Sequence, residues 1–376
     1  MSGIVLFGEL AAIAIIFAIL PLAYLWKKAS FNFFQKLNWV LVFMTFDLIV
    51  FGAFTRLTDS GLGCPDWPGC YGTSNPWHAI GEIQQAEAAM PTGPVTVIKA
   101  WIEMIHRYLA MMVGALIIIQ VGVAWSKVKS LGNTPLLGSI GLLVLVCIQG
   151  AFGAWTVTLK LQPIIVTIHL MLALVLLACL TAYAQKHWQE KNSSIRRLSQ
   201  TPLSAKLIMT AAVVLTIQVF LGAWVSTNYA VLACPDFPTC VGAMWPETAW
   251  QEGFTLWREL GLNAKGEMIS PAALQTIHWA HRVFAIFVVL ILGLLGLNAL
   301  QASNPALPEI GRIAKLLLAL IVLQVLTGIS NVIFQWPLAA ALLHTAGSAA
   351  LVFCLVRLSQ WASWSSLLHI KMDKSL

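Results

Sequence analysis

"FTRLTDSGLGCPDWPGCYG", residues 54–72, returns in altered form as "GAWVSTNYAVLACPDFPTCVG", residues 222–242. Both stretches contain the pattern Cys-Pro-Asp-aromatic-Pro-x-Cys. The likeness continues beyond these two loops, because a His-Arg pair at 106–107 recurs at 281–282, and a later histidine, His169, recurs at the same spacing as His344. The chain therefore contains an internal duplication, and each copy carries one cysteine loop and two matched histidines.

The composition of the chain is that of a membrane protein. Of its 376 residues, 59% are hydrophobic and only 10% are charged, which leaves too little polar surface for a water-soluble fold. A bilayer core of about 30 Å requires about 20 apolar helical residues. The sequence predicts an all-α polytopic membrane protein with about nine transmembrane helices, which lie near 3–26, 36–55, 98–125, 135–156, 163–185, 205–227, 273–300, 312–334 and 337–360.

The duplication divides these helices into two pseudo-symmetric four-helix bundles and one extra N-terminal helix. Both repeats begin on the same side of the membrane, so an axis along the membrane normal relates them. The first helix has neither a charged start nor a small-residue cleavage site, and we expect it to be retained. The predicted layout is an extra N-terminal helix at 1–35, an N-terminal repeat at 36–186, a cytoplasmic linker at 187–204, a C-terminal repeat at 205–360 and a cytoplasmic tail at 361–376.

Basic residues set the predicted orientation. In a nine-helix trace they gather at one face, which the positive-inside rule makes cytoplasmic. The N-terminus and both cysteine loops are then outside, and the C-terminus is cytoplasmic. The net charge of +7 reflects this topology and attraction to lipid headgroups, and it indicates no nucleic-acid partner. The residues at this face are Lys27, Lys28, Lys36, Lys127, Lys129, Lys186, Lys191, Arg196, Arg197, Lys206, Arg312, Lys315, Lys371 and Lys374.

The predicted outward location of the two loops favours disulfide bonds between their cysteines. Thiols outside the cytoplasm tend to be oxidised, and cysteines placed around a proline turn can approach disulfide distance. We predict the bridges Cys64–Cys70 and Cys234–Cys240. Each bridge is either a loop staple or a redox-active pair, and for Cys64 with Cys70 a catalytic role stays open.

Five histidines lie inside apolar helices, where ionisable groups are costly and functional by default, and four of these five recur as two pairs at the repeat spacing. Each of the four lies roughly 10–13 Å below the outer end of its helix. Facing histidines at one level of a four-helix bundle can hold a heme by two imidazole ligands. We predict that His106 with His169 forms one heme-iron site and that His281 with His344 forms the other. The alternative is four buried histidines that only hydrogen-bond across helices.

The two repeats differ one helical turn before the first histidine of each pair. The first repeat has Glu103 there, and the second has His278. A carboxylate in low dielectric can relay protons, act as a general base or stabilise positive charge, so the first site is predicted to be the reactive one. The alternative is an ion pair of Glu103 with Lys99 or Arg107. Arg107 and Arg282 are predicted to pair with heme propionates.

Taken together, these residues resemble the heme A synthase family, membrane enzymes that convert heme O to heme A for cytochrome oxidase. The resemblance runs from about residue 51 to the last helix. Its carriers are "RLTDSGLGCPDWPGC", the Glu-x-x-His-Arg of residues 103–107, His169, the His-Arg of residues 281–282, and His344. The extra helix at 3–26 and the second cysteine pair depart from the plainer family pattern.

The resemblance implies an oxidoreductase that converts the carbon-8 methyl group of heme O to a formyl group by successive hydroxylations, with oxygen from water. It assigns heme b to His281 and His344, the substrate heme to His106 and His169, and the family's acidic residue to Glu103. It also implies a location in the bacterial inner membrane, where lipid surrounds the protein. The reaction requires an electron acceptor, which the sequence does not identify. The expected partners are heme O synthase and cytochrome oxidase assembly; a homo-oligomer is compatible with the sequence, which does not determine the oligomeric state.

Two other classes of function stay open from the sequence. A di-heme, cytochrome b561-like electron carrier would also use paired helix histidines, but it would not need Glu103 or unequal repeats. A membrane thiol oxidoreductase would use the outward cysteine pairs, but it would not need four histidines at one level. Heme extracts of cells with and without the gene distinguish the three.

Overall fold

The computed structural model describes residues 5, 9, 32–191, 203–303 and 307–373. In these ranges the chain forms helices and loops, and its β pairing is limited to three isolated bridges. The predicted helix at 3–26 lies outside the described residues, apart from residues 5 and 9. Eight described helices are long and apolar enough to cross a membrane. They are α2 (Phe33–Leu57), α4 (Val97–Ser126), α6 (Asn133–Thr158), α7 (Pro163–Lys191), α9 (Ala205–Thr227), α11 (Pro271–Ala302), α12 (Pro308–Ile333) and α13 (Leu338–Asp373).

The helix boundaries follow from local chemistry. The side chain of Thr96 accepts the backbone N–H of Lys99 at the start of α4, and Ser270 caps α11 in the same way, next to Pro271. Such caps satisfy backbone donors that a helix start leaves free. At the other ends, a non-glycine residue with left-handed backbone follows α2, α6, α9 and α12 at the same place. These residues are Asp59 (φ 50°), Lys160 (φ 50°), Tyr229 (φ 54°) and Gln335 (φ 54°).

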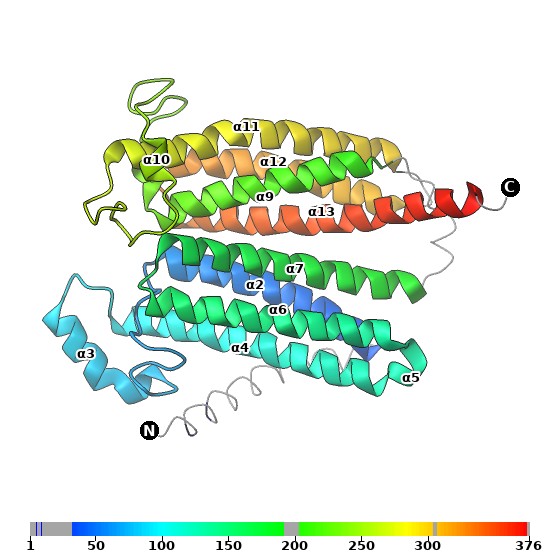
Figure 1. Cartoon of the computed structure of the whole chain (residues 1–376), viewed down its shortest axis with the longest axis horizontal. Coiled ribbons are helices and arrows are strands. Elements are labelled where there is room, and N and C mark those ends of the chain that lie inside the picture. The colour runs from blue at the N-terminus through cyan, green and yellow to red at the C-terminus, as the bar shows by residue number, and fades with distance from the viewer. Residues whose placement is uncertain (1–4, 6–8, 10–31, 192–202, 304–306, 374–376) are drawn as a thin grey trace. The chain divides into compact units, whose positions relative to one another are not determined.

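The chain divides into two compact units, a first unit of Met1–Leu176 and a second unit of Leu177–Leu376. The division falls inside α7, and the predicted linker at 187–204 lies mostly outside the described residues. In the first unit α2 packs on α4, and α4 packs on α6. In the second unit α9, α11, α12 and α13 contact one another in a closed ring (Figure 1).

Large apolar side chains remain exposed on these helices, as membrane lipid requires. Examples are Leu137 and Val144 on α6, and Val322 and Leu326 on α12. Exposed apolar surface on this scale does not suit water. The fold is therefore that of a multi-pass membrane protein.

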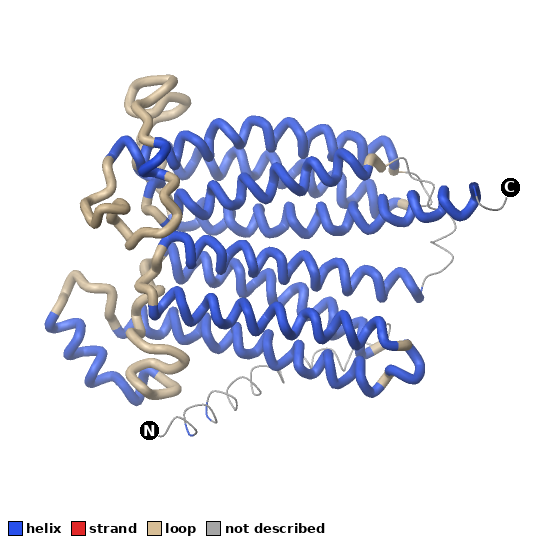
Figure 2. Tube along the Cα trace, in the orientation of Figure 1, coloured by secondary structure: helices blue, strands red, loops and turns tan. Residues whose placement is uncertain are grey.

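Long loops join the first two helices of each unit (Figure 2). The loop between α2 and α4 contains η1 (Pro76–Ala79) and α3 (Ile80–Ala89). The loop between α9 and α11 contains η2 (Ala230–Leu232) and α10 (Trp250–Gly253). Each loop begins with one of the duplicated cysteine patterns, so the repeat seen in the sequence has the same place in both units.

Candidate functional site

The first cysteine loop is a closed turn held by a disulfide between Cys64 and Cys70, whose Cα atoms are 4.9 Å apart. Inside the turn, the carboxylate of Asp66 accepts the backbone N–H groups of Tyr71 (2.6 Å) and Gly72 (2.7 Å). Both cysteines are fully buried. The aspartate in the pattern is therefore needed to satisfy the backbone of the turn.

The second cysteine loop repeats this construction. A disulfide joins Cys234 to Cys240, with Cα atoms 4.5 Å apart, which confirms both predicted bridges. Asp236 accepts the backbone N–H groups of Val241 (2.6 Å) and Gly242 (2.9 Å) and a further hydrogen bond from the hydroxyl of Thr239. The Thr239 bond and then the backbone bonds lower the pKa of Asp236 to about 2.

Glu103 lies buried on α4 directly beneath the first cysteine loop. One carboxylate oxygen, Oε2, accepts the backbone N–H of Cys64 at 2.8 Å. The other oxygen, Oε1, lies 2.5 Å from Nη2 of Arg107, and both side chains are less than a tenth exposed. Of the two interpretations that the sequence left open, the ion pair with Arg107 is present in this structure.

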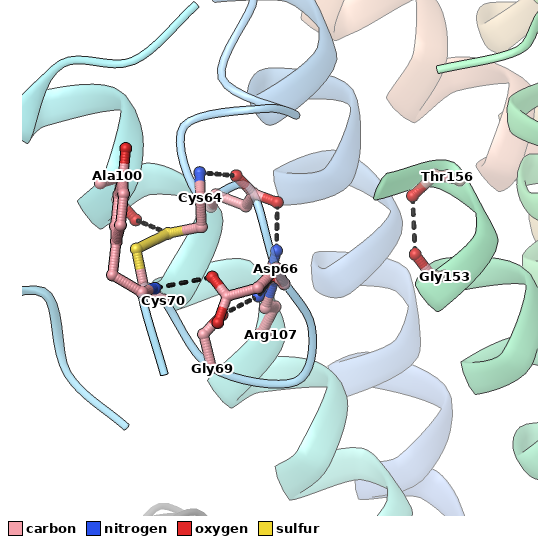
Figure 3. A network of polar contacts seen from close by, with 10 residues as sticks. Cys64, Asp66, Gly69, Cys70, Ala100, Arg107, Gly153 and Thr156 are labelled. Carbon is pink, nitrogen blue, oxygen red and sulfur yellow. Dashed lines mark hydrogen bonds and ion pairs between the residues drawn. A yellow bond between two sulfur atoms is a disulfide. The ribbon is translucent and has the colours of Figure 1, made fainter. Parts of the chain in front are cut away.

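Arg107 connects this ion pair to the loop. Its Nη1 donates to the backbone carbonyls of Asp66 (2.8 Å) and Gly69. Figure 3 shows Arg107 reaching these carbonyls from the helix below the loop. Since Glu103 holds Cys64 and Arg107 holds the middle of the turn, the two side chains fix the whole loop on α4.

Arg282 makes the matching contacts in the second unit. Its Nη1 donates to the carbonyls of Asp236 (2.8 Å) and Thr239 (3.0 Å), and its Nη2 donates to that of Cys234 (2.6 Å). Its Nε donates to Nε2 of His278 at 3.2 Å. Sequence reasoning missed this loop-holding role of the arginines, although the recurrence of a His-Arg pair on the helix that follows each cysteine loop was a signal. The predicted propionate pairing stays a prediction.

The structure brings His281 and His344 together in the second unit. Their ring centroids are 6.4 Å apart, and the ring planes are inclined by 78°. A metal–imidazole distance of about 2 Å places two rings on opposite sides of one metal with centroids about 6 Å apart. The pair therefore fits a heme iron held between two imidazoles.

The four histidines predicted as ligands share a structural device, a contact glycine on the neighbouring helix against which the ring packs. A Cβ added at Gly52, Gly153 or Gly222 would press on the histidine ring, and one added at Gly328 would touch it at ordinary contact distance. Small residues at such points allow helices to approach closely in a membrane. The nearest distances from that Cβ are 3.0 Å for Gly52 to His106, 3.2 Å for Gly153 to His169, 2.9 Å for Gly222 to His281 and 3.4 Å for Gly328 to His344.

One helical turn before three of these contact glycines lies a glutamine whose amide donates to the backbone carbonyl of the histidine. The pairs are Gln149 with His169 (3.0 Å), Gln218 with His281 (3.2 Å) and Gln324 with His344 (2.9 Å). At the fourth place, on α2, the residue is Leu48. His106 instead stacks on Phe51, with ring centroids 6.4 Å apart.

Comparison with known proteins shows the family to which the chain belongs. The family described as cytochrome oxidase assembly protein (COX15-CtaA) matches residues 35–356. The heme A synthase of Shewanella oneidensis is 35% identical over 333 residues, which are 86% of this chain and 96% of that protein.

Two more distant relatives are also heme A synthases. That of Rhizorhabdus wittichii is 29% identical over 57% of this chain and 66% of its own length. That of Halalkalibacterium halodurans is 26% identical over 52% of this chain and 60% of its own length. With the family matched across nearly all of the described helices, the chain belongs to the heme A synthase family of cytochrome oxidase assembly proteins.

Proposed function

We propose that this protein is a heme A synthase, an oxidoreductase that takes heme O as substrate and gives heme A as product. The observation that carries the proposal is the pair His281 and His344, spaced for one iron, in a chain 35% identical to a heme A synthase. The proposed reaction converts the carbon-8 methyl group of heme O to a formyl group by successive hydroxylations, with oxygen from water.

The two histidine pairs divide the work. In our proposal His281 and His344 hold a resident heme b, whereas His106 and His169 bind the substrate heme. When bound, heme b supplies one-electron redox chemistry. The chain's own contribution is to hold each ring against its contact glycine, which fixes the position of the ring between two helices. Glu103 lies one helical turn before His106, whereas His278 lies one helical turn before His281. A carboxylate beside the first pair alone supports reaction at the first site.

Glu103 is the proposed catalytic residue at the substrate site. Its place on α4, one turn before His106, brings a carboxylate near that site, and Arg107 and the N–H of Cys64 hold it in position. A fixed negative charge in a poorly screened environment can stabilise positive charge that develops on the substrate carbon. Because both oxygens already accept hydrogen bonds, we propose electrostatic stabilisation rather than proton transfer.

The two disulfides are proposed to brace the loops. Cys64 and Cys70 are fully buried, and Sγ of Cys64 contacts the carbonyl of Ala100 on α4 at 3.8 Å. Redox exchange needs an accessible sulfur. Burial therefore supports a structural role over a catalytic one.

The proposal includes the predicted membrane layout. Two pseudo-symmetric four-helix bundles and an extra N-terminal helix would lie in the bacterial inner membrane, with the cysteine loops outside and the C-terminus cytoplasmic. The proposed partners are heme O synthase, which supplies the substrate, and cytochrome oxidase assembly, which takes the product. The proposal also includes an electron acceptor for the oxidation, contact with the surrounding lipid and assembly as a homo-oligomer.

Expression in a bacterium that makes heme O but no heme A tests the proposal. Hemes are extracted from cells with and without the gene and separated by chromatography. Heme A is expected only when the protein is present, and His106→Ala, made at wild-type protein level, should abolish it. Folded protein that leaves the heme O pool unchanged overturns the proposal and favours a di-heme electron carrier.

A further inference from the structure

The two histidine pairs differ in what holds the outer ring nitrogen, Nδ1. In the second unit, the hydroxyl of Thr327 on α12 lies 2.9 Å from Nδ1 of His344. The same hydroxyl donates its proton to the carbonyl of Leu323 at 2.7 Å. A hydroxyl has one proton to donate, and with that proton on the carbonyl of Leu323 the oxygen of Thr327 is an acceptor for Nδ1–H. In this arrangement the imidazole proton sits on Nδ1, and Nε2 carries the free lone pair that an iron requires.

The matching position in the first unit cannot do this. Thr327 directly precedes the contact glycine Gly328, and the residue that directly precedes Gly153 is Phe152. A phenyl ring accepts no conventional hydrogen bond from an imidazole N–H. Accordingly, Nδ1 of His169 is buried and has no hydrogen-bond partner among the described residues.

The first histidines of the two pairs do not show this difference. The amide nitrogen of Gln218 lies 3.1 Å from Nδ1 of His281, but an amide NH₂ group only donates, so this contact does not hold a proton on Nδ1. The residue at the matching place on α2 is Leu48, and the contacts that the structure describes include no hydrogen bond to the ring of His106. Within the described contacts, His344 is therefore the member of the two pairs whose Nδ1 has a neighbour that can accept its proton.

A hydrogen bond to the outer nitrogen of a metal-binding histidine fixes its tautomer, orients the ring and makes the inner nitrogen more basic. Loss of such a partner typically lowers metal affinity by about 10- to 100-fold. Four ligands of one residue type can therefore hold two hemes with very different strength. A resident heme needs the strong arrangement, whereas a substrate that must leave as product needs the weak one.

We propose that Thr327 is a positioning residue that makes the heme of the second site permanent, and that Phe152 at the matching position leaves His169 a weaker ligand, so that heme exchanges at the first site. This inference rests on the proposed assignment of the two histidine pairs to hemes. It concerns how long each heme stays, and it is independent of the oxidation chemistry itself.

The test compares Thr327→Val, which keeps the shape and removes the hydroxyl, with Thr327→Ser, which keeps the hydroxyl. Purified, folded protein is mixed with excess apomyoglobin, and transfer of heme b is followed by absorbance. Thr327→Val is expected to lose heme b about 10- to 100-fold faster than wild type and to show a changed midpoint potential. Thr327→Ser is expected to behave like wild type.

The reciprocal variant, Phe152→Thr, keeps the inference open to refutation if Thr327→Val does not fold. It is expected to slow the release of heme from the first site without altering heme b. Wild-type exchange rates and potential in a folded Thr327→Val protein, or unchanged release from Phe152→Thr, overturn the inference alone. A folded wild-type protein without heme b overturns the proposed function and the inference with it.

Discussion

Replacing Glu103 by Gln is the most informative single change in the first unit, because both carboxylate oxygens are in use. One accepts the N–H of Cys64 at 2.8 Å, and the other pairs with Arg107 at 2.5 Å. A glutamine has only one acceptor oxygen. If that oxygen keeps the bond from Cys64, the amide NH₂ group faces the guanidinium, and donor meets donor.

The cost can be bounded from the contacts. Removing one partner of a buried ion pair costs about 3–5 kcal/mol, but Arg107 retains the carbonyls of Asp66 and Gly69. A hydrogen bond to a charged group contributes about 1.5–3 kcal/mol, and we expect a loss near this range, about 2–3 kcal/mol. For a unit of this size, that corresponds to a fall in Tm of roughly 5–10 °C.

Thermal unfolding in detergent measures this loss, with Glu82→Gln at an exposed position of α3 as the matched control. The Cys64–Cys70 bridge should also be reduced faster by dithiothreitol in Glu103→Gln, while the bridge of the second loop serves as an internal reference. A Tm equal to that of the control would refute the ion-pair reasoning. Heme A per folded protein should fall on the order of a hundredfold, and a wild-type yield would end the catalytic proposal.

Three further outcomes are expected. Gly222→Ala should weaken the b-type absorption band, because its Cβ would lie 2.9 Å from Cε1 of His281. Gly293→Ala on α11 is the control, since its Cβ meets open space and should leave the band unchanged. Equal spectra of the two variants would contradict the role of Gly222. The lowered pKa of Asp236, about 2 against an ordinary 3.8, means that its stabilisation is complete above about pH 4 and is lost as the pH falls toward about 2. The Tm difference between wild type and Asp236→Asn should shrink only between about pH 4 and pH 2. A difference that already shrinks near neutral pH would contradict the assignment of this stabilisation to the Asp236 carboxylate. The cysteines of both loops should resist alkylation until the protein is reduced, and rapid labelling without reductant rules out the bridges.

Much of the fold could be predicted because apolar runs determine where a chain crosses a membrane. The run at 98–125 became α4 (Val97–Ser126), and the run at 135–156 became α6 (Asn133–Thr158). Eight of the nine expected spans are found among the described residues. The duplication was equally readable, because the two cysteine loops share a local pattern that needs no knowledge of tertiary contacts.

The contacts of the site could be predicted only in part. The sequence indicated that His281 and His344 lie together, as the structure shows, but the role of Arg107 depends on how the carbonyls of the cysteine loop turn toward α4. The importance of Thr327 depends in the same way on contact between α12 and α13. Such contacts join residues from separate helices, and sequence spacing within one helix does not reveal them.

Counting the hemes bound to purified histidine variants tests the central claim most directly. Wild type, His344→Ala and His169→Ala are purified, their hemes are extracted, and each heme type is quantified per folded protein. We expect His344→Ala to lose heme b, and His169→Ala to keep heme b while losing heme O and heme A. Heme b retained in full by His344→Ala, or lost equally from both variants, would contradict the assignment of a resident heme to the second unit and a substrate heme to the first.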